Sequence, residues 1–144
     1  MTALTVEQRA FLDRPLHAIV ATLDAEGQPS QSVVWYVREG DSLWISVGPE
    51  SVKARHVRHD PRVSVLVLSE DGSAYLRLEG TATVDGTVDD TARATLIGRY
   101  VGQEATAGWP RTPCPRPTHA CGSWRRGSAR TISAECHFMA GTKT

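Results

Sequence analysis

The fold of this chain is decided in residues 46–63, which read SVGPESVKARHVRHDPRV. A Gly-Pro pair ends the β-like run before it, and an Asp-Pro pair ends the helix predicted over residues 50–59. Lys53 and Arg55 lie in the first turns of that helix, where backbone N–H groups and the helix dipole also favour an anion. The stretch therefore predicts a phosphate site, unless its cations only solvate an exposed helix face.

The segments on either side of this stretch predict an antiparallel, mainly β protein with small helices. Three apolar runs precede it, at residues 18–23, 32–37 and 43–47, and short turns that contain glycine join them. Two further runs follow at residues 63–68 and 75–84. Because the connections are mostly hairpin-sized, we expect a three-stranded meander before the helix, and a barrel or sandwich rather than a βαβ fold.

Local sequence patterns predict the helices that precede and follow the five β runs. A capping box at Thr5 and Gln8 predicts a short helix near the N-terminus, and a second helix is predicted from about residue 88 to 101. In the last β run Leu76, Leu78 and Ala82 share one face, as expected of a sheet with one face against the core.

Composition excludes several classes of protein. The 144 residues suit one domain, and 40% hydrophobic with 22% charged residues is typical of a globular chain. The net charge of zero argues against nucleic-acid binding, which normally requires a basic face. No apolar run approaches the ~20 residues that span a bilayer, so we expect a cytoplasmic protein with no membrane or nucleic-acid partner.

The residues quoted above resemble a known family. The runs ATLDAEGQP at residues 21–29 and VVWY at 33–36, together with residues 46–63, resemble the split β-barrel of the pyridoxamine 5'-phosphate oxidase-like flavoproteins. More narrowly, they are similar to the short bacterial members that bind the deazaflavin coenzyme F420. The resemblance covers about residues 8–101. It implies an antiparallel split β-barrel of the FMN-binding type that works as a homodimer, with the cofactor ring in a groove at the dimer interface.

The resemblance also implies which residues contact the cofactor. Position-by-position matching adds residues of two strands and of the helix start to Lys53 and Arg55, and the implied set is Ala21, Thr22, Gln31, Ser32, Val33, Ser46, Val47 and Ser51. Thr22 and Ser32 are equally well interpreted as ordinary strand residues on a wet face.

Aromatic and titratable residues give fewer candidates. Trp35, Tyr36 and Trp44 are candidates for the substrate side of the ring, although aromatic residues in strands are core residues more often. No dedicated acid or base is demanded, because the cofactor carries the chemistry. His17 and Tyr36 are the only weak candidates for a catalytic proton donor.

The function implied by the resemblance is an oxidoreductase that transfers a hydride from reduced coenzyme F420 to an electron-poor small organic substrate. FMN is the alternative cofactor, because both cofactors carry phosphate and have similar ring edges. A non-catalytic flavin- or deazaflavin-binding protein is a second hypothesis, and a stress or interaction protein with an empty site is a third.

The pattern changes beyond residue 102. Residues 1–102 hold 10 Lys and Arg against 14 Asp and Glu, whereas residues 103–144 hold 6 against 2. We therefore divide the chain into a split-barrel domain, 1–102, and an atypical tail, 103–144, in which residues 108–127 show neither helical nor strand periodicity. The tail is interpreted as a product of a shifted reading frame or as a disordered or partner-binding segment. A zinc site is the weakest interpretation, because no C-x-x-C pair occurs among the possible ligands Cys114, His119, Cys121, Cys136 and His137.

Overall fold

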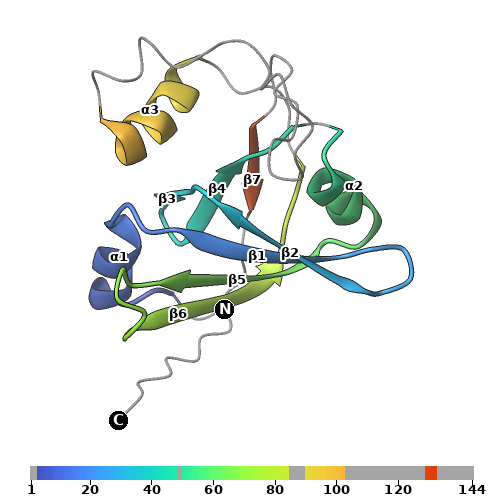
Figure 1. Cartoon of the computed structure of the whole chain (residues 1–144), viewed down its shortest axis with the longest axis horizontal. Helices are drawn as coiled ribbons and strands as arrows, with labels where there is room; N and C mark the ends of the chain where they lie inside the picture. The colour runs from blue at the N-terminus through green and yellow to red at the C-terminus, as the bar shows by residue number, and fades with distance from the viewer. Residues whose placement is uncertain (1–2, 49, 85–89, 103–128, 133–144) are drawn as a thin grey trace.

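The computed structural model describes residues 3–48, 50–84, 90–102 and 129–132 of the chain. Three helices and seven strands lie in these ranges (Figure 1). In chain order they are α1 (Val6–Asp13), β1 (Ala18–Leu23), β2 (Pro29–Val34), β3 (Val37–Glu39), β4 (Ser42–Ser46), α2 (Val52–His59), β5 (Arg62–Leu68), β6 (Tyr75–Thr81), α3 (Asp90–Val101) and β7 (Ala129–Ile132). In the described ranges, no helix combines the length and the apolar character needed to cross a membrane.

The strands form two antiparallel sheets. One sheet has the order β2-β1-β5-β6 and the other β3-β4-β7. The two sheets enclose one core, because Val20, Val65 and Leu78 of the first sheet belong to the same buried cluster as Leu43 and Ile45 of β4. The predicted mainly β fold with small helices is confirmed.

The expected three-stranded meander is wrong, because the run at residues 32–37 is two strands in different sheets. β2 ends at Val34 and β3 begins at Val37, so the chain leaves one sheet for the other at Trp35 and Tyr36. The backbone N–H of Tyr36 donates to the hydroxyl of Tyr100 on α3, at 3.2 Å, rather than to a neighbouring strand. Strand β4 consequently pairs with β3 and not with β2.

Local signals of the sequence are confirmed elsewhere. Thr5 caps α1, with its hydroxyl accepting from the N–H of Gln8 while the Gln8 side chain accepts from the N–H of Thr5. Leu76, Leu78 and Ala82 are all buried on the face that β6 and the residue after it turn to the core.

Of the segment 103–144, only β7 lies within the described residues. It pairs with β4 in antiparallel register, from Leu43 opposite Ile132 to Ser46 opposite Ala129. β7 therefore covers this edge of β4, and it lies outside residues 108–127, for which the sequence showed no strand periodicity. The cysteine and histidine residues weighed as zinc ligands lie outside the described residues, and the division of the chain at residue 102 stays a prediction.

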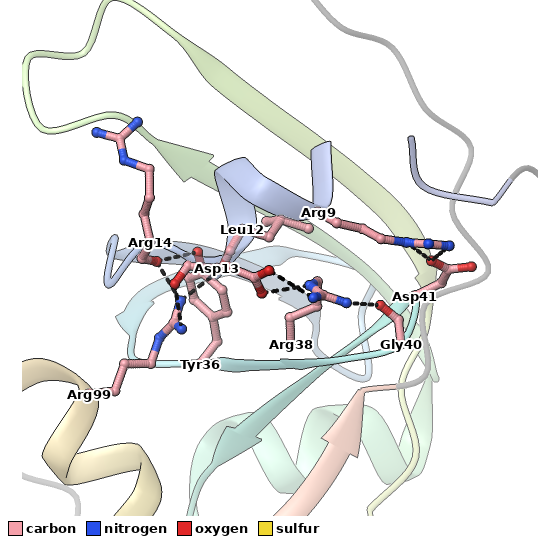
Figure 2. A network of polar contacts seen from close by, with 9 residues as sticks. All are labelled: Arg9, Leu12, Asp13, Arg14, Tyr36, Arg38, Gly40, Asp41 and Arg99. Atoms are coloured by element: carbon pink, nitrogen blue, oxygen red, sulfur yellow. Dashed lines mark hydrogen bonds and ion pairs between the residues drawn. The ribbon is translucent and has the colours of Figure 1, made fainter. Parts of the chain in front are cut away.

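Helix α3 is held against the end of α1 by Arg99. Its guanidinium donates to the carbonyl oxygens of Leu12 at 2.7 Å, of Asp13 at 2.9 Å, and of Arg14 (Figure 2). These oxygens belong to the last turn of α1 and the residue that follows it, where carbonyls lack a partner within the helix and the helix dipole favours a cation. Arg99 thereby ties together the two helices through contacts between residues more than eighty positions apart in the sequence.

Candidate functional site

A small cavity lies between α2 and the strands of both sheets. Its volume is about 30 Å³, enough for one or two water molecules and far below the ~300 Å³ at which small-molecule sites begin. Its wall is mostly aliphatic, with only three polar side chains, and consists of Val20, Thr22, Ile45, Val47, Lys53, Ala54, Val57, Ala82, Thr83 and Val84. The first sheet supplies Val20 and Thr22 from β1, and the second supplies Ile45 from β4.

Lys53 is the charged residue of this wall. Its side chain is half-buried, and burial lowers the pKa of the ammonium below its usual value. Within the described residues, Lys53 makes neither an ion pair nor a hydrogen bond through its side chain. A partly desolvated cation without a protein partner is stabilised by an anion from outside the chain.

The start of α2 adds backbone donors beside Lys53. Ser51 caps the helix, and its hydroxyl accepts from the N–H of Ala54 at 3.3 Å. The first N–H groups of a helix have no partner within it, and those of Val52 and Lys53 have no acceptor among the described residues. The ammonium and these N–H groups together suit an anion such as a phosphate.

Thr22 gives the cavity a buried hydroxyl. Its side chain is 2% exposed, and its Oγ1 lies 3.0 Å from Nδ1 of His56 on α2. His56 follows Lys53 by three residues, so both lie on neighbouring parts of the same helix face. Sequence reasoning had not assigned a role to His56, although this spacing from Lys53 was a usable signal.

The structure separates Lys53 from Arg55. Residues two apart on a helix point about 200° apart, and Arg55 is exposed and does not line the cavity. The expectation that both cations meet at one anion is not tested by this placement and stays a prediction. The contact of Arg55 with a cofactor stays a prediction.

The predicted ring contacts from β1 and β2 lie on two faces of the sheet. Thr22 points to the cavity side, and Ser32, which pairs with Val20, shares that face. Ala21 and its partner Gln31 lie on the opposite face, together with Val33, which is 65% exposed. A ring held by one chain cannot contact all of these side chains, so the set as a whole stays a prediction.

The remaining predicted residues flank the cavity. Val47 lines it, directly after β4, whereas Ser46 ends β4 opposite Ala129 and is half-buried. Ser51 serves as the cap of α2. Thr22, Val47 and Lys53 are thus the members of the predicted set that the structure brings together.

The two weak proton-donor candidates lie away from the cavity. Tyr36 is fully buried, its hydroxyl donates to the carbonyl of Arg14 at 3.3 Å, and burial raises its pKa to about 12. His17 is exposed, with its ring 5.9 Å from that of Tyr100. Neither residue lines the cavity, and Tyr36 acts as a core residue.

The tryptophans near β3 also pack in the protein. Trp44 is 7% exposed and packs against Leu96 of α3. Trp35 stacks on the ring of Tyr100, with centroids 4.9 Å apart. The interpretation of these aromatic residues as packing residues is therefore the one that the structure supports.

Comparison with known proteins places this geometry in a family. Residues 4–117 match the family model described as pyridoxamine 5'-phosphate oxidase. Similar solved structures include an F420 reductase, with 20% identity, a TM-score of 0.67, and coverage of 97% of this chain and 100% of that chain. A conserved hypothetical protein, Rv2991 of Mycobacterium tuberculosis, has 21% identity, a TM-score of 0.65, and coverage of 92% and 82%.

A heme-related structure is similar to the same degree. HutZ, the heme storage protein of Vibrio cholerae, has 18% identity and a TM-score of 0.62, with coverage of 96% of this chain and 95% of that chain. These likenesses confirm the antiparallel split β-barrel fold. At such identities they concern the fold alone.

Proposed function

This chain belongs to the pyridoxamine 5'-phosphate oxidase family, and on that premise we propose that it is an oxidoreductase that transfers a hydride from reduced coenzyme F420 to an electron-poor small organic substrate. The cofactor is held between two copies of the chain. FMN is the alternative cofactor on the same scaffold.

One observation carries this proposal: the half-buried ammonium of Lys53 faces the cavity beside the start of α2 and has no anionic partner among the described residues. Its side-chain surroundings in the cavity are aliphatic apart from two threonines. An anion there would recover the solvation that the ammonium has lost and would accept from the backbone N–H groups of Val52 and Lys53. Both F420 and FMN carry such an anion as a phosphate.

The size of the cavity supports a ring bound outside it. About 30 Å³ cannot hold a three-ring heterocycle, so the ring would extend from the phosphate over the surface of the protein. The outer face of β2 presents Gln31 and Val33, which is 65% exposed, so this face is open to a second copy of the chain. These features favour a ring sandwiched in a homodimer, with the predicted contacts of the outer face coming from the partner.

The bound cofactor would supply the hydride chemistry, and the side chains of this protein would bind and orient it. Lys53 and the start of α2 would fix the phosphate, and Val47 and Thr22 would limit access of water to it. Tyr36 has its proton held by burial and lies elsewhere, so it takes no part in this mechanism.

A second function is binding without turnover. The contacts that Lys53 and the start of α2 offer to an anion would hold a ligand whether or not it transfers a hydride. The heme storage protein among the similar structures shares this fold.

Measurements of cofactor binding and of turnover distinguish the oxidoreductase function from binding without turnover. We expect the purified protein to bind F420 or FMN, followed by quenching of F420 fluorescence or by flavin absorption. Lys53→Met should weaken the binding by about 10- to 150-fold, the equivalent of about 1.5–3 kcal/mol for a charge-assisted contact. Lys53→Arg should retain most of the affinity.

Arg58→Met is the matched control, because it removes the same charge from the exposed face of the same helix. Equal affinity of wild type and Lys53→Met would overturn the phosphate assignment. Oxidation of reduced F420 by a quinone or enone would support the oxidoreductase function. Tight binding without oxidation would support the function of binding without turnover.

A further inference from the structure

The hydrogen bond between Thr22 and His56 is not used by the function proposed above. It joins the buried strand β1 to α2 at 3.0 Å, and it is the only hydrogen bond of either side chain within the described residues. Thr22 lines the same cavity as Lys53. The pair therefore connects the proposed anion site to a titratable ring.

Three arrangements of hydrogens are compatible with this contact: the two neutral tautomers of His56 and its protonated form. When His56 is neutral with its hydrogen on Nε2, the hydroxyl of Thr22 donates to Nδ1 and both groups are satisfied. When Nδ1 carries a hydrogen, as in the other neutral tautomer and in the protonated ring, it must donate to Oγ1, and the hydroxyl hydrogen of Thr22 must find another acceptor. Among the described residues its only hydrogen-bond partner is Nδ1 of His56, and the side chain is 2% exposed, so a second acceptor must come from the cavity.

Because an unpaired buried donor is costly, the arrangement in which the Thr22 hydroxyl donates to Nδ1 satisfies this contact best in the protein without ligand. An anion in the cavity changes this balance, since its oxygen can accept from Thr22 and its charge attracts the imidazolium. It also offsets the repulsion between the imidazolium and Lys53, one turn away on α2.

We propose that His56 is a positioning residue for the cofactor phosphate: on binding, His56 takes up a proton and turns the hydroxyl of Thr22 from His56 to the phosphate. This inference rests on the anion site of the proposed function and gives that site a second, proton-linked contact.

The other groups near His56 do not provide a competing explanation. The elements packed on the cavity side of α2 contribute to the cavity only side chains that do not titrate, which are Val20, Thr22, Ile45, Val47, Ala82, Thr83 and Val84. On α2 and its cap, the titratable neighbours one turn away are Lys53, His59 and Asp60. His59 is exposed, and the carboxylate of Asp60 is engaged by Arg62 at 2.6 Å.

Isothermal titration calorimetry tests the proton uptake directly. Wild-type protein is titrated with F420 and, separately, with FMN near pH 7.5, in two phosphate-free buffers that differ in ionisation enthalpy. Histidine changes charge between about pH 5 and 8, so we expect an uptake of up to about one proton per ligand, and an affinity that falls by up to about tenfold per pH unit.

Variants assign the proton to His56. His56→Asn keeps a polar group beside Thr22 but cannot titrate in this range, and it should abolish the uptake, whereas His59→Asn, the matched control, should retain it. Thr22→Val should weaken binding by about tenfold or more and also abolish the uptake, and Thr22→Ser should restore both. Thermal unfolding of each free variant shows whether it is folded. If Thr22→Val does not fold, the decision rests on His56→Asn and Thr22→Ser.

The outcomes distinguish this inference from the proposed function. Binding that depends on Lys53 but takes up the same number of protons in wild type and His56→Asn would overturn the role of His56 and leave the phosphate site intact. If neither ligand binds to wild type, or if binding is indifferent to Lys53→Met, both proposals are overturned. Comparing variants with wild type cancels any protonation of the ligand's own phosphate.

Discussion

Arg99→Met should loosen the attachment of α3 to the barrel. Arg99 donates to three backbone carbonyls at the end of α1, those of Leu12, Asp13 and Arg14. Its guanidinium also lies over the ring of Tyr36, 5.1 Å from the centroid. Methionine keeps most of the apolar stem and removes the donors and the charge.

The magnitude follows from these contacts. Hydrogen bonds from a charged donor contribute about 1.5–3 kcal/mol each when buried, and two of the three here are exposed, so we take about 1 kcal/mol for each. The stabilisation from these three hydrogen bonds is partly offset, because Nε of Arg99 is buried without an acceptor among the described residues. That unpaired donor costs about 1 kcal/mol. The expected net loss in the free energy of unfolding is about 2 kcal/mol.

Urea unfolding followed by circular dichroism measures this loss. With a denaturant slope of about 2 kcal/mol per molar urea, the midpoint should fall by about 1 M. Arg9→Met is the matched control, because Arg9 pairs with Asp41 at 2.9 Å while both side chains are about two-fifths exposed. It should cost less than about 1 kcal/mol. Equal midpoints for the two variants would refute the role of Arg99 as the attachment of α3.

Two further predictions concern pH. Burial raises the pKa of Tyr36 to about 12, so the stability that its neutral form contributes is present below the ordinary pKa of tyrosine and is lost as pH rises toward 12. Between those two pH values the free energy of unfolding of the wild type should fall by about 1.4 kcal/mol per pH unit. Tyr36→Phe should lack this fall in alkaline unfolding curves. Hydrogen bonds from the Ser69 hydroxyl and from Ser73 lower the pKa of Asp71 to about 2. The stability from Asp71 is therefore present above its ordinary pKa of 3.8 and lost as pH falls toward 2. Asp71→Asn should show a shallower acid unfolding curve, and identical curves would contradict this assignment.

Local sequence signals predicted most of the elements but not the change of sheet at Trp35 and Tyr36. The capping box at Thr5 and the alternation of β6 involve neighbouring residues, so they can be recognised in the sequence. The break after Val34 has no glycine or proline to mark it. It depends on the bond between the N–H of Tyr36 and the hydroxyl of Tyr100, sixty-four residues later, and no local pattern contains that contact.

The candidate site was predictable to a similar extent. Lys53 was found from its place at the start of a helix after a strand, and the structure puts it in the cavity wall. Helical geometry alone could have separated it from Arg55, since residues two apart do not share a face. The contact of His56 with Thr22 joins segments thirty-four residues apart, so only the folded structure reveals it.

The placement of these residues divides the proposed site into two parts with different tasks. The proposed phosphate contacts lie within one chain, on α2 and β1, and they would not distinguish F420 from FMN, because both cofactors carry a phosphate that could face Lys53. The cavity is too small to contain the ring of either cofactor, so surfaces outside the cavity must select the cofactor. The outer face of β2, with Gln31 and the exposed Val33, is the surface that a second copy would complete. On this proposal, different residues would set the affinity for the phosphate and the choice of cofactor, and substitutions in α2 should weaken binding of both cofactors alike.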